Sequence, residues 1–220
     1  MKNLHNALLL KHLYQLKELG YKYTSEKVFS ENDQNLLKLP NSLIALKQQA
    51  FNCHLCSLSK SRNQVVFGEG DENAEVMFIG DVPLEIEDNE GKPFLGRGGE
   101  MLTAMIEKVL GLSRENVYIS NLLKCHPLAS QEVHESEFHT CKAYLFKEIK
   151  LVNPKIIITL GEKAYHYLSN DTHSLTEIRG TIIQKEKHII LPTYHPNFLL
   201  KNPSFKKEVF KDLQKVKKLL

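Results

Sequence analysis

Lys155-Ile-Ile-Ile-Thr-Leu160-Gly161 is the stretch of sequence that decides the fold. Three consecutive isoleucines form an apolar run of strand length without polar alternation, which is typical of a strand buried on both faces of a sheet. Gly161 ends the run, and the residues from Glu162 to Leu168 continue as a predicted helix. The same strand pattern occurs three more times in the chain, at residues 75–80, 117–122 and 188–192.

Helical segments separate the four predicted strands. Apolar spacing predicts helices over residues 98–110 and 136–152, and a lysine-rich helix from about residue 204 closes the chain. Strands that alternate with helices build a parallel sheet with helices on both faces, so the predicted class is α/β. Ligands of such sheets bind beyond the carboxyl ends of the strands. Those ends are Gly80–Pro83, Asn121–Cys125, Gly161-Glu162 and Thr193–Pro196.

The N-terminal forty residues differ from the rest of the chain. Leucines at helical spacing between Leu4 and Leu19 predict a short helix, which Gly20 ends. The polar residues 21–40 lack periodicity and close with Pro40, which is typical of a linker. We therefore expect an N-terminal helical extension and linker over residues 1–40, and an α/β domain over residues 41–220.

The composition is that of a globular protein. Of the 220 residues, 42% are hydrophobic and 25% are charged, with a formal net charge of +3 that neither requires nor excludes nucleic acid. No apolar run approaches the roughly 20 residues that span a membrane, and Lys11 interrupts the short Leu8–Leu10 run, so no signal peptide is predicted. We expect a cytoplasmic protein that does not bind membranes.

All four cysteines fall in two neighbourhoods. Cys53 and Cys56 form a Cys-x-x-Cys pair, Cys125 follows the second predicted strand, and Cys141 lies on the next helix. Disulfides are rare in the cytoplasm, so metal ligation or redox chemistry is favoured over ordinary buried thiols. Four thiolates suit a zinc ion and a [4Fe–4S] cluster equally well, and the spacing does not choose between them.

A glycine-rich loop, Gly91-Lys-Pro-Phe-Leu-Gly-Arg-Gly-Gly99, leads into the first helix after the first strand. Its glycines allow close approach of a ligand, and the free N–H groups at the helix N-terminus suit a phosphate. Phe94 in this loop is either a core residue or a platform for a stacked ring. Taken singly, Asn121 and His195 are also compatible with structural roles.

Taken in order, these motifs resemble the iron–sulfur (family 4) uracil-DNA glycosylases, a group that includes phage-type DNA polymerase-related proteins. The resemblance covers residues 42–220. The motifs that carry it are Cys53-x-x-Cys56, Gly80-Asp-Val-Pro83, Gly91-Lys-Pro-Phe-Leu-Gly-Arg97, Tyr118-Ile-Ser-Asn-Leu-Leu-Lys-Cys-His-Pro127, Arg179-Gly180 and Tyr194-His-Pro-Asn-Phe-Leu-Leu-Lys-Asn-Pro203.

The resemblance implies a three-layer α/β/α sandwich with a four-stranded parallel sheet. It also implies a structural [4Fe–4S] cluster, with four cysteine ligands: Cys53, Cys56, Cys125 and Cys141. The implied activity is that of a DNA-repair hydrolase, which cleaves the N-glycosidic bond of uracil in DNA and leaves free uracil and an abasic site.

The resemblance implies a role for each residue at the strand ends. Phe94 would stack on a flipped-out uracil, and Asn121 would read its O4 and N3–H edge. His195 would donate to O2 while the base leaves as an anion. Asp81 is the candidate that positions the attacking water or stabilises the sugar cation.

The first motif departs from the family pattern. The family commonly has Gly-Glu-Ala/Gly-Pro-Gly where this chain has Gly80-Asp81-Val82-Pro83-Leu84. Asp81 is one methylene shorter than glutamate, and Val82, which can still offer its backbone N–H to the base, adds bulk, as does Leu84. Two alternatives therefore stay open: a DNA-binding member with weak catalysis, and a glycosylase for another deaminated base such as hypoxanthine or xanthine.

Candidate DNA contacts surround these motifs. Leu199, within Phe198-Leu199-Leu200, is a candidate for the apolar wedge that replaces a flipped base, although this stretch could equally anchor the last helix. The expected partner is uracil-containing DNA, single- or double-stranded, bound by a monomer, and the sequence does not identify which proteins it binds. The candidates for phosphate contacts are Lys92, Arg97, Lys124 and Lys201.

Overall fold

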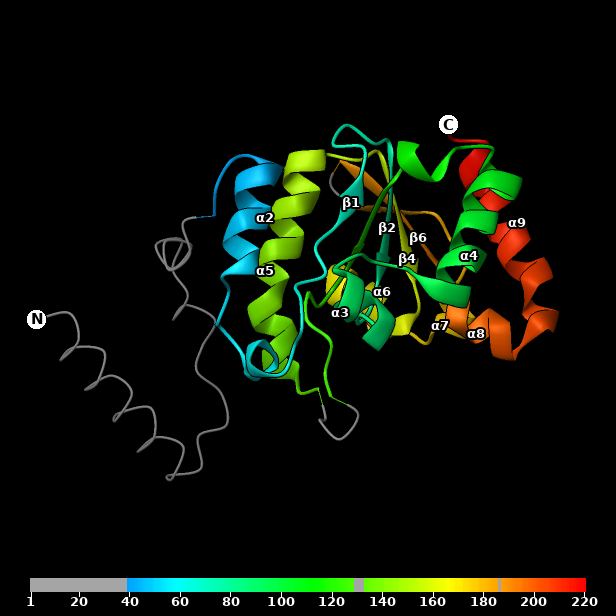
Figure 1. Cartoon of the computed structure of the whole chain (residues 1–220). Coiled ribbons are helices and arrows are strands. Elements are labelled where there is room, and N and C mark those ends of the chain that lie inside the picture. The colour runs from blue at the N-terminus through cyan, green and yellow to red at the C-terminus, as the bar shows by residue number, and fades with distance from the viewer. Residues whose placement is uncertain (1–38, 129–132, 186) are drawn as a thin grey trace, which may run out of the picture. The chain divides into compact units, whose positions relative to one another are not determined.

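The computed structural model describes residues 39–128, 133–185 and 187–220 (Figure 1). Apart from its last two residues, the predicted extension over residues 1–40 lies outside the described residues. The helices and strands in chain order are α2 (Leu43–Phe51), β1 (Glu69–Gly70), β2 (Val76–Gly80), α3 (Glu85–Glu90), α4 (Gly96–Met105), β3 (Tyr118–Asn121), α5 (Glu135–Val152), β4 (Ile156–Leu160), α6 (Glu162–Ser169), α7 (Leu175–Ile178), β5 (Ile183–Lys185), β6 (His188–Thr193), α8 (Pro196–Lys201) and α9 (Lys206–Lys217).

The described strands form one mixed sheet in the order β1-β3-β2-β4-β6-β5. The four predicted strands are β2, β3, β4 and β6, and they pair in parallel at its centre. The prediction of a four-stranded sheet was wrong in number, because β1 and β5 add antiparallel pairs at the two edges. These edge strands have two and three residues, too few to produce a recognisable alternation of apolar side chains.

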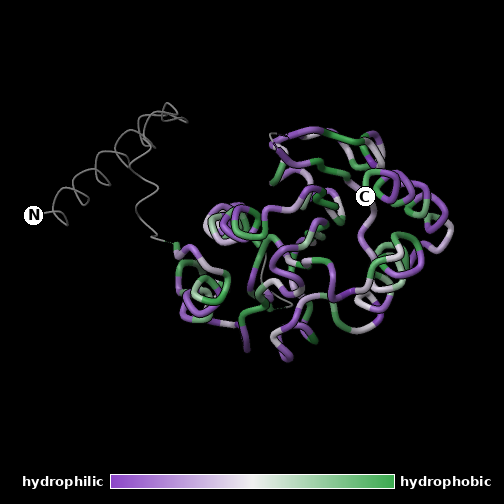
Figure 2. Tube along the Cα trace, turned by 90° about the horizontal axis from the view of Figure 1, so that it is seen from above, coloured by the Kyte–Doolittle hydropathy of each residue, from purple (hydrophilic) through white to green (hydrophobic). Residues whose placement is uncertain are grey.

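Helices cover both faces of the sheet, which confirms the predicted α/β class. Successive side chains of a strand point to opposite faces, so β2 sends Met77 and Ile79 into one core and Phe78 into the other. The first core lies against α2 and α5, and the second against α4 and α9 (Figure 1). In Figure 2 the helices are banded with hydrophobic and hydrophilic residues, as expected when one side of each helix packs on a sheet.

Three short helices were missing from the prediction. The helices α3, α7 and α8 have six, four and six residues, which is too short for apolar periodicity to identify. The predicted helix over residues 98–110 is α4 continued by a π-helical turn at Ile106–Leu110, and Gly111 ends it with a φ of 77°. Within the residues that the structure describes, no helix is both long and apolar enough to cross a lipid bilayer.

Candidate functional site

The carboxyl ends of the four parallel strands bring the predicted site residues to one edge of the sheet. Gly80 at the end of β2 lies opposite Asn121 at the end of β3. Leu160 at the end of β4 lies opposite Thr193, which is two residues before His195. Residues that are far apart in the chain therefore share one edge, as the strand-end rule for open α/β sheets predicts.

Gly80 allows two of these residues to come close together. A Cβ atom at this position would lie 2.5 Å from Cζ of the Phe94 ring, and it would also collide with Oδ1 of Asn121. Only the absence of a side chain leaves room for both groups. The aromatic ring and the amide therefore meet over the end of β2.

The loop before α4 holds Phe94 in an unusual conformation. Its φ is +54°, a left-handed value that costs free energy in a residue with a side chain. Two partners hold the loop: the Glu87 carboxylate accepts the N–H of Leu95 at 3.3 Å, and the Arg114 guanidinium donates to the Pro93 carbonyl at 2.9 Å. The ring is buried in the second core and stacks on the His195 ring, with centroids 5.6 Å apart and planes 28° apart. Phe94 is thus both a core residue and part of the site.

His195 is a neutral hydrogen-bond donor. Burial lowers its pKa to about 4, so the ring is uncharged near neutral pH. Its Nδ1 accepts the N–H of Asn197 at 3.1 Å, at the start of α8. A neutral imidazole that accepts at Nδ1 carries its proton on Nε2. The ring can therefore donate to a ligand from Nε2 without bringing a positive charge.

Asp81 follows β2 and lies beside the start of α6. Its Oδ1 accepts the N–H of Ala164 at 2.9 Å. Burial raises the pKa of this carboxyl to about 6, an effect opposed by that hydrogen bond and by the Lys163 ammonium. Gly161, with a φ of 97°, separates Asp81 from His195: a Cβ there would lie 3.4 Å from Asp81 Oδ2 and 3.6 Å from His195 Cβ. A carboxylate and a neutral imidazole therefore flank one glycine.

Asn121 has an unsatisfied donor. The residue is 2% exposed, and its Nδ2 is a buried side-chain atom without a hydrogen-bond partner among the described residues. Buried amide groups in proteins nearly always have a partner, and an unpaired one costs free energy. An orphaned amide beside an aromatic ring is therefore a site where a polar, planar ligand would complete the hydrogen bonding.

Val82 and its neighbours form the other wall of this edge. Val82 is partly buried against the first core, while Leu84, the residue just before α3, is 41% exposed. His126 lies close to this loop, since its Nδ1 is 2.7 Å from the Pro83 carbonyl oxygen. The bulk that Val82 adds to the first motif is thus accommodated in the core rather than left in the site.

Two of the sequence-predicted DNA contacts are in the interior, and these assignments were wrong. Lys124 is buried, and its ammonium pairs with Glu148 at 2.5 Å, so it does not reach a phosphate. Leu199 is 1% exposed in the second core, so it anchors α8 and is not a wedge. Its neighbour Phe198 is 36% exposed and stacks on Tyr194 with centroids 4.8 Å apart.

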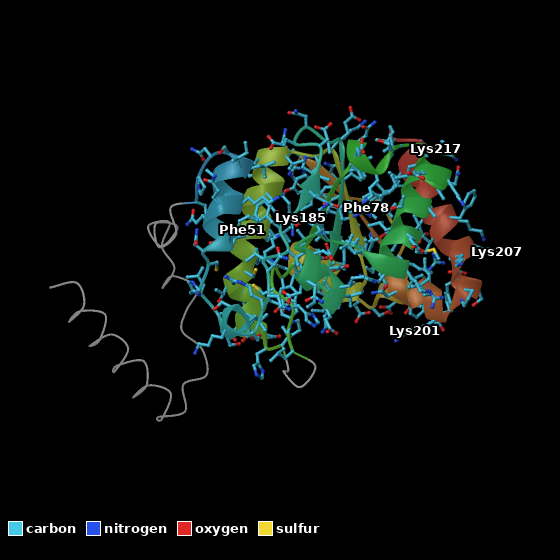
Figure 3. All side chains as sticks on the ribbon, in the orientation of Figure 1. Phe51, Phe78, Lys185, Lys201, Lys207 and Lys217 are labelled. Atoms are coloured by element: carbon cyan, nitrogen blue, oxygen red, sulfur yellow. The ribbon has the colours of Figure 1, made fainter. Side chains whose placement is uncertain are left out.

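The other three candidate DNA contacts are exposed. Lys92 lies on the Phe94 loop, Arg97 lies in the first turn of α4, and Lys201 lies at the end of α8. In Figure 3, Lys201 lies at the lower edge of the molecule and Lys207 of α9 at its right edge, whereas Lys217 is at the opposite, upper end of α9. Exposed cations such as Lys92, Arg97 and Lys201 are suited to a phosphate backbone.

Sequence reasoning missed two residues that support the site from outside it. Glu87 and Arg114 hold the Phe94 loop, and neither lies in a motif that indicated such a role. Arg179, which belongs to the Arg179-Gly180 motif, supports the segment before His195: its guanidinium donates to Asp212 at 2.9 Å, and Asp212 accepts the Thr193 hydroxyl at 2.9 Å. The Arg179 side chain thus pairs with α9 in this structure.

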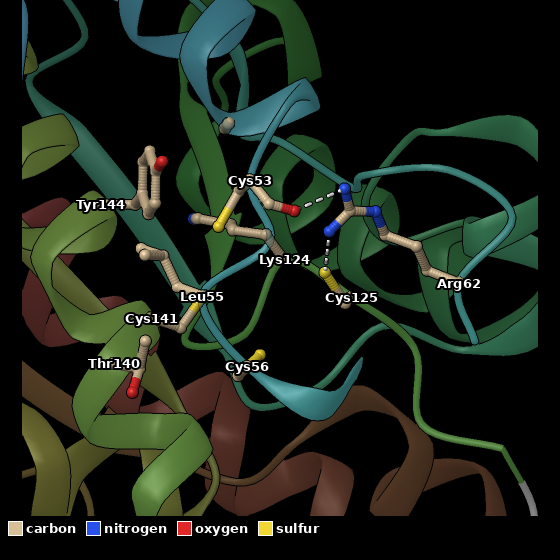
Figure 4. A pocket seen from close by; sticks show the side chains of 10 residues that line it. Cys53, Leu55, Cys56, Arg62, Lys124, Cys125, Thr140, Cys141 and Tyr144 are labelled. Carbon is tan, nitrogen blue, oxygen red and sulfur yellow. Dashed lines mark hydrogen bonds between the residues drawn. The ribbon is translucent and has the colours of Figure 1, made fainter. Parts of the chain in front are cut away.

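The four cysteines line one pocket between α2, the end of β3 and α5 (Figure 4). All four are free thiols. Arg62 spans the pocket wall: it donates to Cys125 Sγ at 3.3 Å and to the Cys53 carbonyl at 2.8 Å, as the dashed lines of Figure 4 show. Burial raises the pKa of the Cys141 thiol to about 12 and also raises those of Cys56 and Cys125.

The cysteine pocket has the donor atoms that a metal centre needs. In the described parts of the chain, no three His, Cys, Asp or Glu side chains converge closely enough to hold a metal ion as they stand. The four thiols nevertheless line one pocket with the cationic Arg62 beside them, and four thiolates suit a zinc ion or an iron–sulfur cube.

The close packing of Phe94 and Asn121 around Gly80 leads to a testable prediction. Gly80→Ala is expected to displace the Phe94 ring and the Asn121 amide, and to destabilise the fold by about 1–3 kcal/mol through overpacking. Ala74→Val is the matched control, because it also adds bulk to a buried position of the first core, but before β2, at the opposite end of that strand from Gly80. Thermal unfolding should report both changes, whereas ligand binding at the strand ends should fall only in Gly80→Ala. Equal binding losses in the two variants would contradict this account.

Comparison with known proteins identifies the family of this chain. Residues 67–214 match the family model described as the uracil DNA glycosylase superfamily. The type-4 uracil-DNA glycosylase of Sulfurisphaera tokodaii is 40% identical over 187 residues, which cover 81% of this chain and 85% of that protein. The type-4 uracil-DNA glycosylase of Saccharolobus solfataricus is 41% identical over 188 residues, covering 82% and 87%. A DNA polymerase of Bacillus phage SP01 is 27% identical over 153 residues, covering 70% of this chain and 16% of the polymerase. The chain therefore belongs to the uracil DNA glycosylase superfamily and, within it, to the type-4 uracil-DNA glycosylases.

Proposed function

We propose that this protein excises uracil from DNA by hydrolysing the bond between N1 of the base and C1′ of the deoxyribose. The observation that carries the proposal is the buried Asn121 amide beside the Phe94 ring, whose Nδ2 has no partner in the described part of the chain. The membership in the type-4 family supports the same substrate.

The Asn121 amide is suited to select uracil. Its Nδ2–H donates to O4 and its Oδ1 accepts from N3–H. Cytosine presents an amino group and an unprotonated N3 at the same positions, so both hydrogen bonds would be reversed. Mispaired groups in a buried site are penalised steeply, which lets a single amide reject cytosine strongly.

Phe94 and His195 then act on the base that Asn121 selects. Stacking on the ring of Phe94 offsets part of the cost of unstacking, with about 1–3 kcal/mol for each stacked base. His195 donates from Nε2 to O2, where negative charge grows as the C1′–N1 bond breaks and its electron pair stays with uracil. Because the ring is neutral, it stabilises the uracil anion without transferring its proton.

Asp81 serves the sugar side of the reaction. The breaking bond leaves positive charge on C1′ and the ring oxygen, which a nearby carboxylate stabilises. The same carboxylate orients the water whose oxygen bonds to C1′ and accepts one of its protons. The products are an abasic sugar and free uracil, which recovers a proton from solvent.

The proposed DNA contacts are those that are exposed. Lys92, Arg97 and Lys201 meet phosphates, and Phe198 takes the wedge position that Leu199 cannot fill. An aromatic side chain at this place would occupy the space that a flipped base leaves. Neither contact depends on the sequence of the DNA.

We also propose that the four cysteines hold a [4Fe–4S] cluster: Cys53, Cys56, Cys125 and Cys141. The group would supply structural cross-linking rather than chemistry on the base. It would join the Cys-x-x-Cys loop to the end of β3 and to α5, which are separate in the sequence. The Arg62 guanidinium would offset part of the negative charge of the thiolates.

The experiment that tests the function is release of free uracil from a labelled oligonucleotide by anaerobically purified protein whose iron has been counted. Single- and double-stranded substrates with uracil, hypoxanthine, xanthine, cytosine or thymine form the panel. Release of uracil alone supports the proposal. Release of hypoxanthine or xanthine instead would favour the alternative substrate, and DNA binding without any release would favour the catalytically weak member.

Asn121→Ala is expected to lower the rate of uracil release by about a hundredfold or more, because the side chain that reads O4 and N3–H of the base is lost. Affinity for undamaged DNA should not change, since the phosphate contacts are untouched. Asn116→Ala is the matched control: it is the same substitution on an exposed residue before β3, at the other end of that strand. Undiminished release by Asn121→Ala would remove the residue from the site.

A further inference from the structure

Lys124 is a lysine without access to solvent. It is 2% exposed, and its Nζ has three partners: Glu148 Oε2 at 2.5 Å, Ser120 Oγ at 2.6 Å and the Asn121 carbonyl oxygen at 2.9 Å. The ammonium can donate three hydrogen bonds, and all three are used. Because all three of its donors are bonded to buried partners, the Lys124 side chain is held in a fixed geometry.

Glu148 completes this buried network from α5. It is fully buried, and besides Lys124 it accepts the Ser120 hydroxyl at 2.9 Å, the Gly68 N–H at 3.1 Å and the Tyr118 hydroxyl at 3.2 Å. Tyr118 and Ser120 lie on β3, so the carboxylate links α5 to the strand that ends at Asn121. A buried ion pair with every partner satisfied costs little to keep, but it is costly to break by removing one member.

Lys124 also lies between the base-reading amide and the cysteine pocket. It lines that pocket together with Cys125 and Cys141 (Figure 4). Four residues, Asn121 to Lys124, therefore connect the orphaned amide to the segment that carries Cys125. Two backbone hydrogen bonds hold this turn against the end of β2, from Leu122 to the Gly80 carbonyl and from Leu123 to the Asp81 carbonyl.

We propose that Lys124, held by Glu148, is a positioning residue that fixes the Asn121 amide and thereby sets the base affinity of the site. Asn121 is the last residue of β3. Lys124 Nζ donates to its carbonyl oxygen. A misplacement of about 1 Å in such a group costs about a hundredfold in rate. The inference rests on the proposed uracil excision. It adds the residue that holds the Asn121 amide, which hydrogen-bonds the base, in position.

The test is the double variant Lys124→Met/Glu148→Gln. Methionine keeps the length of the side chain without the donor, and the paired change avoids the unpaired buried carboxylate that Lys124→Met alone would leave. Lys185→Met is the matched control, because Lys185 donates to two backbone carbonyls, of Leu168 and Ser169, at the far end of α6. Circular dichroism and iron content verify that each variant is folded and loaded.

Three quantities are measured: kcat for uracil release, the inhibition constant of free uracil, and the Kd of an abasic-site duplex. In the double variant we expect kcat to fall about ten- to a hundredfold and the inhibition constant to rise about tenfold, with an unchanged Kd for the duplex. Lys185→Met should match the wild type in all three. A folded double variant with wild-type kcat and uracil inhibition would overturn the inference. Absence of release by the wild-type protein would instead overturn the proposed function, so the two failures are distinguishable.

Discussion

Asp81→Asn is expected to slow uracil release by about a thousandfold while making the folded protein more stable at neutral pH. The loss of rate follows because the amide cannot accept a proton from water or neutralise the sugar cation, and a positioned carboxylate in such a role contributes about 10²–10⁴-fold. The hydrogen bond from Ala164 to Oδ1 survives in the variant, so the change removes the charge and leaves the position.

The gain in stability follows from the raised pKa. Burial moves the pKa of Asp81 from 3.8 to about 6, so the folded state binds this proton more tightly than the unfolded state. Stability therefore falls as the pH rises from about 4 to 6, and above pH 6 the ionised carboxylate destabilises the fold by up to about 3 kcal/mol. The asparagine variant lacks this penalty and should unfold at a higher temperature at pH 7.5, and its stability should lose that pH dependence.

The pH profile of the reaction separates Asp81 from His195. The carboxylate form is the active one, so kcat is expected to rise with pH through about 6 and then level off. His195, whose pKa is about 4, stays neutral across that range. Single-turnover rates between pH 4.5 and 8.5 should show the rise in the wild type and not in Asp81→Asn.

Asp88→Asn is the control for these measurements. Asp88 is also buried beyond β2, and it accepts the backbone N–H of Asn63 at 2.8 Å. The substitution should lower stability and leave the rise of kcat near pH 6 in place. An Asp81→Asn variant with the wild-type rate and pH profile would show that another group orients the water and stabilises the sugar cation.

Cys125→Ala is expected to abolish iron binding and, with it, stable folding of the domain. Three segments meet at the cysteine pocket, and burial makes bare thiolates there unfavourable unless a metal compensates them. The free energy of metal binding in such sites is comparable to the 5–15 kcal/mol of net stability in an ordinary domain. Removal of iron from the wild type by a chelator should have the same effect.

Iron and sulfide counting and thermal unfolding check this prediction. Thr140→Ser is the control, because Thr140 lines the same pocket and serine can keep the hydrogen bond to the Ser136 carbonyl. That variant should hold the wild-type amount of iron. A stable Cys125→Ala protein with four irons would remove Cys125 from the ligand set, and anaerobic wild-type protein with zinc and no iron would overturn the cluster.

Much of the fold could be predicted from local patterns. The runs at β2, β3, β4 and β6 are apolar throughout because each strand is covered on both faces, and this property is visible without knowing any partner. The glycines and prolines that follow those strands mark where the chain turns. Since parallel strands end at one edge, Asp81, Asn121 and His195 could be assigned to a shared site before any distance was known.

The prediction of DNA contacts was less accurate because residue type does not determine the direction of a side chain. Lys124 has a charge that suits a phosphate, but a carboxylate 24 positions later on α5 pairs with it in the interior. Leu199 belongs to an apolar triplet, and helical geometry turns it into the core while Phe198 stays exposed. Exposure depends on packing between distant elements, which no local pattern records.

From the amino-acid sequence alone followed the α/β class, the strand ends as the expected site, and the four cysteines as candidate ligands. These follow from periodicity and from the positions of residue types, which are local. Only the tertiary structure decided that the Asn121 donor has no partner among the described residues, that His195 is neutral and that Asp81 has a raised pKa. Each of these properties depends on burial and on partners from other elements, because desolvation and hydrogen bonding act through space and not along the chain.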